Sequence, residues 1–142
     1  MSEIGLSKAR RLVRGVLKKG REMGLKPLSV VVLDAGGHLK AFEREDGASP
    51  GRFEIARGKA YAVVMTGMTG TALMKRAEDQ AYFVSALNGA FDGKVIPVPG
   101  GVLLRDARGR IVGAVGVTGD TSDNDAIAAL AGIEDVGLVG EA

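Results

Sequence analysis

Lys59 is the residue whose neighbours most suggest chemistry. It stands in the run ARGKAYA over residues 56–62, where small side chains leave room for its amine to approach another backbone. A partly buried lysine amine has a lowered pKa and can act as a base or form a Schiff base. The sequence therefore makes Lys59 a candidate catalytic or ligand-binding residue.

The run PVPGG over residues 97–101 is a second candidate. After Pro99, the backbone N–H groups of Gly100 and Gly101 are free to donate to a carboxylate, phosphate or carbonyl oxygen. Joined to Lys59, with a carboxylate as proton carrier, this loop would suit an isomerase, lyase or hydratase that acts on a small carboxylate. The candidate proton carriers are Asp46 and Asp125. The alternative is a tight entry into the following strand.

Charged residues also flank the turn-rich segment 45–52. Arg44 stands just before this segment, Asp46 is its second residue and Arg52 is its last. Such residues beside an apolar helix can line a pocket for an anionic ligand. The alternative is a set of surface ion pairs, worth ~0–1 kcal/mol each.

His38 and Tyr61 are the candidate iron ligands. His38 is the only histidine, and the chain has no cysteine. A site with three histidines from one chain and all thiolate chemistry are therefore excluded. His38 could ligate haem iron or act as a general base. Because it follows a turn glycine, a surface position without function is the alternative.

Charge is unevenly distributed along the chain, although the net charge is only +2. Residues 1–26 carry eight basic side chains against two acidic ones, and residues 119–142 carry six acidic side chains and no basic one. A basic helix can bind nucleic acid. Since aromatic residues make up only 4% of the chain, we expect instead a solvated face, or two ends that neutralise each other within or between subunits.

Length and composition indicate one domain, residues 1–142, with 46% apolar residues and 25% charged ones. The chain shows no leader and no apolar run of about 18–20 residues that could span a membrane. We therefore expect a cytoplasmic protein without a membrane partner.

Hydrophobic spacing predicts three long helices and two hairpins. We expect helices over about 6–22, from Phe53 to near Gly67 or Gly70, and through Leu73 to Leu87. Two strands over 28–34 and 38–44 would meet at a DAGG turn, and two over 101–106 and 110–118 at a DARG turn. A last helix over about 124–132 would be capped by Asp123 or Asn124. This pattern predicts an α+β fold.

Five segments, taken in order, resemble the GlcG/HbpS family, which also supplies the C-terminal domain of PduO-type proteins. The resemblance covers residues 4–135. Its motifs here are VVLDAGGHL (31–39), REDGA (44–48), IA followed by KA (55–60), PVPGG (97–101), and VGAVGVTG (112–119) with Asp125 beyond it. This sequence departs from the pattern at Glu45, where Met is usual, and at Ala62, where Thr is common.

The resemblance implies a five-stranded antiparallel sheet flanked by helices, in a profilin- or PAS-like arrangement. It also implies a homo-oligomer, from dimer to octamer, that binds a small ligand, with haem as the named candidate. In that interpretation Arg44, Arg52 or Lys59 would pair with the haem propionates, and His38 or Tyr61 would approach the iron. The small-carboxylate enzyme stays open as the alternative.

Overall fold

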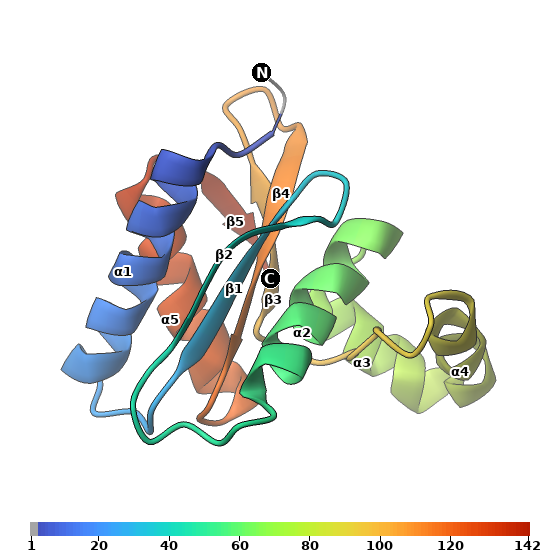
Figure 1. Cartoon of the computed structure of the whole chain (residues 1–142). Helices are drawn as coiled ribbons and strands as arrows, with labels where there is room; N and C mark the ends of the chain where they lie inside the picture. The colour runs from blue at the N-terminus through green and yellow to red at the C-terminus, as the bar shows by residue number, and fades with distance from the viewer. Residues whose placement is uncertain (1–2) are drawn as a thin grey trace.

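The computed structural model describes residues 3–142, and over them the chain forms five helices and one five-stranded antiparallel sheet (Figure 1). The sheet order is β2-β1-β4-β3-β5. The strands are β1 (Ser29–Asp34), β2 (Leu39–Arg44), β3 (Gly101–Arg105), β4 (Ile111–Thr118) and β5 (Val139–Glu141). The helices are α1 (Leu6–Glu22), α2 (Arg52–Thr66), α3 (Gly70–Asp79), α4 (Ala81–Ala90) and α5 (Ser122–Asp135). The α+β class and the five-stranded antiparallel sheet are both confirmed.

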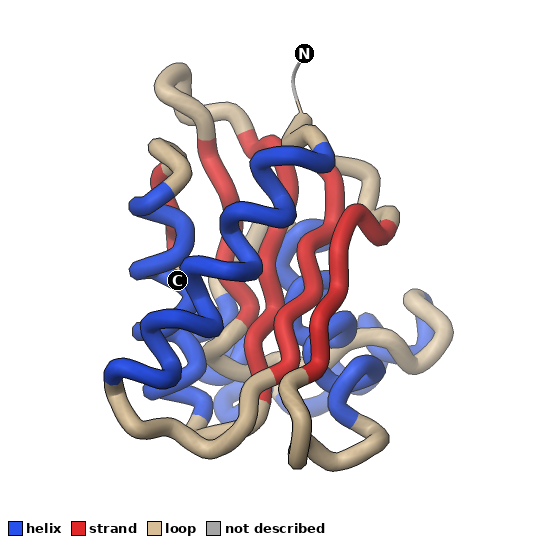
Figure 2. Tube along the Cα trace, turned by 60° about the vertical axis from the view of Figure 1, so that its left-hand side comes forward, coloured by secondary structure: helices blue, strands red, loops and turns tan. Residues whose placement is uncertain are grey.

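Helices cover both faces of the sheet (Figures 1 and 2). Because side chains alternate along a strand, Val30 and Val32 of β1 join the core beneath α1 and α5, whereas Val31 and Leu33 join the core beneath α2. Every residue of β1 is buried, as is typical of a central strand that is packed on both sides.

Both hairpins close with the same turn chemistry. The Oδ1 atom of Asp34 accepts hydrogen bonds of 3.0 Å from the N–H groups of Gly36 and His38. Asp106 accepts in the same way from Arg108 and Arg110, at 2.9 and 3.0 Å. An aspartate at the first turn position commonly satisfies the backbone in this way.

The structure corrects two expectations and adds one strand that no local pattern indicates. The single helix expected through Leu73 to Leu87 is two helices, because Gln80 leaves helical geometry (φ −141°, ψ 65°) between α3 and α4. The cap of α5 is Thr121, whose hydroxyl accepts from the N–H of Asn124, rather than Asp123 or Asn124. Finally, no residue pattern had predicted β5, which has only three residues.

The α3–α4 pair extends beyond the edge of the main body (Figure 1). Only Val84 of α4 is buried. No helix in the described part of the chain is long and apolar enough to cross a bilayer.

Candidate functional site

Lys59 lies on the buried side of α2 and points into the protein. Its Nζ donates to the Oδ2 of Asp125 at 3.1 Å and to the carbonyl oxygen of Val117 at 3.0 Å. The two side chains are 4% and 0% exposed. The other carboxylate oxygen of Asp125 accepts from the N–H of Asp120 at 3.0 Å. Lys59 therefore ties α2 to β4 and to the start of α5.

Burial dominates the electrostatics of this pair. It lowers the pKa of Lys59, and the negative charge of Asp125 opposes that shift. Burial likewise raises the pKa of Asp125, and the charge of Lys59 opposes it. Each charge is thus tolerated in the protein interior because the other is present.

Gly100 and Gly101 lie directly against Lys59, with no hollow between them. A Cβ on Gly101 would overlap the backbone carbonyl of Lys59, and one on Gly100 would lie 3.0 Å from its Nζ. The carbonyl of Gly100 accepts from the N–H of Val117 at 2.9 Å. Pro99 is buried as well. This segment forms a tight entry into β3, the alternative weighed above, and it brings α2 close to the sheet.

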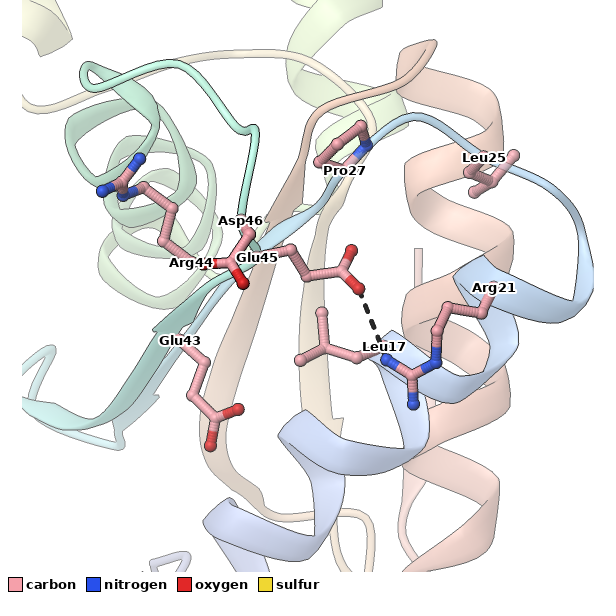
Figure 3. Close-up of a pocket in the computed structure, with 8 residues that line it drawn as sticks. All are labelled: Leu17, Arg21, Leu25, Pro27, Glu43, Arg44, Glu45 and Asp46. Atoms are coloured by element: carbon pink, nitrogen blue, oxygen red, sulfur yellow. Dashed lines mark hydrogen bonds and ion pairs between the residues drawn. The ribbon is translucent and has the colours of Figure 1, made fainter.

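Asp46 is not brought to Lys59. It is exposed on a surface hollow of about 430 Å³ (Figure 3). The lining residues are Leu17, Arg21, Leu25, Pro27, Glu43, Arg44, Glu45 and Asp46. Glu45 is held by Arg21 at 3.3 Å and by the N–H of Leu28 at 2.7 Å. Three carboxylates against two guanidinium groups make this hollow a poor match for a dianionic porphyrin.

The two predicted arginine contacts are already engaged. Arg44 donates to the carbonyl of Ala48 at 2.7 Å. Arg52 donates at 3.0 Å to the hydroxyls of Ser49 and Thr118. They brace the loop between β2 and α2, and their roles as ligand contacts stay predictions.

His38 and Tyr61 lie beside neighbouring glycines of the turn between β1 and β2. The His38 ring folds back over Gly36, since a Cβ there would lie 3.1 Å from its Cδ2. Next to it, Gly37 packs against Tyr61 and Met65 of α2. His38 is exposed and Tyr61 is half-buried. The turn therefore brings both candidate iron ligands to one end of α2.

A row of aromatic side chains continues from this turn along α2. We call this row, together with the two cations that lie on it, the α2 flank. It consists of Phe42, Phe53, Arg57, Tyr61, Phe91 and Lys94. The Phe42–Phe53 and Tyr61–Phe91 ring pairs are edge-to-face, with centroids 4.9 and 5.8 Å apart. All six side chains are half-buried.

Two cations lie on these rings. The guanidinium carbon of Arg57 is 5.2 Å from the centre of Phe53, and the Nζ of Lys94 is 5.5 Å from the centre of Tyr61. The Nε of Arg57 is buried without a hydrogen-bond partner. The sequence analysis missed this flank, although Phe53, Arg57 and Tyr61 recur at a spacing of four residues, which places them along one side of a helix.

Metal coordination by acidic clusters has no support in the part of the chain that the structure describes. Across residues 3–142, no group of three or more histidine or carboxylate side chains is placed to hold a metal ion.

Comparison with known proteins agrees with this fold. The family described as haem degrading protein HbpS-like matches residues 4–134. Among solved structures, a PduOC:heme complex is similar with a TM-score of 0.84 at 22% identity, covering 96% of each chain. HbpS is similar with a TM-score of 0.80 at 26% identity, covering 95% of this chain and 91% of that one.

A further similar structure is protein ORFY of Klebsiella pneumoniae, with a TM-score of 0.82 at 23% identity over 94% of this chain and 90% of that one. No curated protein matches the sequence.

Proposed function

Because the chain belongs to the HbpS-like family of haem-degrading proteins, we propose that it is a cytoplasmic homo-oligomer that binds haem. The similarity to a PduOC:heme complex supports the ligand, since that fold accommodates haem. A shared fold alone does not fix a function. The proposal therefore depends on whether residues of this chain suit a porphyrin.

The α2 flank carries the proposal. Haem is a planar apolar ring system with two carboxylates and a metal ion, and it needs flat apolar contacts, cations and an axial ligand. The flank offers aromatic rings from Phe42, Phe53 and Phe91, and its Tyr61 lies against the turn that carries His38. Both histidine and tyrosine are known axial ligands of haem iron.

Arg57 and Lys94 are the cations best placed for the propionates. Among residues 3–142 the Nε of Arg57 has no hydrogen-bond partner, and a buried donor without a partner costs about 1–3 kcal/mol. A carboxylate would remove that cost. The previously predicted Lys59 is instead committed to Asp125, and its side chain is 4% exposed. Nothing in this geometry favours catalysis at Lys59.

When bound, haem would supply a redox-active iron. The residues of this chain would bind the porphyrin, orient it along α2 and anchor its carboxylates. A half-buried flank leaves one side of the porphyrin uncovered, so a second copy would be needed to enclose it. Exposed apolar side chains elsewhere agree with assembly, among them Leu39, Tyr82 and Val139.

Titration of the purified chain with hemin tests the proposal. We expect a Soret shift that saturates, and His38→Ala or Tyr61→Phe should change its position. Arg57→Gln should weaken binding about tenfold, or 1.4 kcal/mol. Tyr82→Phe is the matched control, because Tyr82 is 73% exposed on α4 and lies outside the α2 flank. A titration without a Soret shift, or one that all three variants leave unchanged, would overturn the proposed site.

A further inference from the structure

Helices α1 and α5 form one outer layer of the protein. They lie side by side on the same face of the sheet (Figures 1 and 2). Two glycines let them approach closely, since a Cβ on Gly15 would lie 3.1 Å from the Cα of Gly132. The layer therefore joins the basic first helix to the acidic last one.

The outward side of α1 is a basic stripe, consisting of Arg10, Arg11, Arg14, Lys18 and Arg21. All five side chains are exposed. Arg10 and Arg11 are neighbours, and from Arg11 on the set recurs at spacings of three and four residues, which keeps it on one side of the helix. In the part of the chain that the structure describes, only Arg21 of this stripe forms an ion pair, with Glu45.

The outward side of α5 is an acidic and apolar stripe, consisting of Asp123, Ile127, Leu130 and Glu134. Its spacing of four, three and four residues again keeps the set on one side. Ile127 and Leu130 are 47% and 38% exposed. No ion pair joins this stripe to α1 among residues 3–142. Charges expected to neutralise each other lie in adjacent helices, yet they face outward.

We propose that this layer docks onto the same layer of a second copy of the chain. The two copies are related by a two-fold axis that runs parallel to the helices, between the two layers and midway between α1 and α5. Rotation about this axis places α1 of each copy on α5 of the other. The basic stripe then faces an acidic stripe twice in one isologous interface. Ile127 and Leu130 become covered, together with Leu6, which is 53% exposed at the start of α1.

Two hollows in the layer offer room for side chains of the copy. One, of about 350 Å³, is lined by Leu6, Ser7, Arg10, Arg11 and Arg14. The other, of about 220 Å³, lies between the helices and is lined by Gly15, Lys18, Lys19, Glu22, Ala131, Glu134 and Asp135. The first hollow combines Leu6 with three guanidinium groups. It therefore suits a glutamate of the second copy that has a leucine beside it.

The size of the layer makes charge decisive. Helices of 17 and 14 residues at about 1.5 Å per residue and about 10 Å in width cover roughly 450 Å² per copy. Two copies would bury roughly 900 Å², close to the ~1,000 Å² at which specific interfaces begin. An interface this small depends on its charge complementarity, so added salt should weaken it.

This inference rests on the homo-oligomer part of the proposed function and adds a contact surface separate from the one where a copy would cover the α2 flank. The two can fail separately, because the α2 flank lies on the opposite face of the sheet. Hemin titration reports on the flank, and the molecular mass in solution reports on this layer.

Sedimentation velocity of the full chain with charge-swapped variants tests the interface. The first variant, Arg10→Glu with Arg14→Glu, reverses the charge at two of the five positions of the basic stripe. The second, Asp123→Lys with Glu134→Lys, makes the outward stripe of α5 basic. Each variant alone should repel its own copy and show half the wild-type mass or less. An equimolar mixture should regain the wild-type mass, because each altered helix then faces an opposite charge.

The control for the first variant is Lys75→Glu with Arg108→Glu, which lowers net charge by the same amount at exposed positions on α3 and a hairpin turn. It should assemble like the wild type. Raising salt from about 50 to about 500 mM should reduce the wild-type mass. The proposal is overturned if either variant assembles normally, or if the mixture stays apart while each component is folded. It is also overturned if the wild type is a monomer that binds a DNA duplex through α1.

Discussion

The Nζ of Lys59 and the Oδ2 of Asp125 lie 3.1 Å apart inside the protein, although 66 residues separate them in the chain. The pair joins α2 to the N-terminal turn of α5, and the carbonyl of Val117 completes it from β4. One lysine thus links α2 and α5, which lie on opposite faces of the sheet, to the central strand β4. Burial of both charges makes each partner dependent on the other.

Lys59→Met should destabilise the fold by about 3–5 kcal/mol, because it leaves the carboxylate of Asp125 buried without its cation. Burial already raises the pKa of Asp125, and losing Lys59 removes the charge that opposes this shift. The folded variant therefore favours a protonated Asp125. This protonation stabilises the folded state at low pH, and the stabilisation is lost as pH rises. The deficit relative to wild type, measured by urea unfolding, should shrink on mild acidification.

Adding Asp125→Asn tests the same contact through a double-mutant cycle. The double variant should lose less stability than the two single variants lose together, by about 1–3 kcal/mol. Lys75→Met is the control, since Lys75 pairs with Asp79 at the surface and should lose no more than about 0.5 kcal/mol. Additive losses at Lys59 and Asp125 would contradict the structural role of the pair.

Gly101→Ala should destabilise the protein by at least about 1–3 kcal/mol, the usual cost of overpacking. Its new methyl group would overlap the backbone carbonyl of Lys59, which cannot move without shifting α2. Gly89→Ala is the matched control, because nothing lies within 4 Å of that position in α4. It should instead gain about 0.5–1 kcal/mol of stability from helix propensity. Thermal unfolding of both variants provides the measurement.

Local signals in the sequence were enough to predict most of the fold. The turns at Asp34 and Asp106 are set by side-chain bonds to N–H groups two and four residues away, so each hairpin could be read from a few adjacent residues. The same holds for α1, whose apolar spacing predicts its observed bounds, Leu6–Glu22.

Features that depend on distant contacts could not be predicted. Lys59 and Asp125 were grouped around a ligand, because nothing in the sequence reveals that the two side chains pair directly with each other. Periodicity continues unchanged across Gln80, where the backbone leaves the helix. Likewise, the α2 flank combines residues of β2, of α2 and of the segment after α4. Only its α2 members share a spacing that the sequence shows.

Thr121→Ala should cost about 1 kcal/mol, because the threonine hydroxyl accepts from the N–H of Asn124 at 3.2 Å and caps α5. Asp125 follows in the first turn, so fraying there would also loosen the contact with Lys59. Ser122→Ala is the neighbouring control, as no side-chain bond of Ser122 is found in α5, and its effect should stay within about 0.5 kcal/mol. Equal losses at both positions, measured by urea unfolding, would refute Thr121 as the cap.

Asp120 should make the protein acid-sensitive. The side-chain amide of Asn124 and the N–H of Lys26 bind its carboxylate and lower its pKa from 3.8 to about 2. The ionised carboxylate therefore stabilises the fold above pH 3.8, and this stabilisation is lost as the pH falls toward about 2. Asp120→Asn should be less stable than wild type at neutral pH, and the difference should narrow across that interval. Asp92→Asn, at an exposed position, serves as the control in the same urea titrations. A difference that stays constant with pH would show that the carboxylate charge contributes nothing.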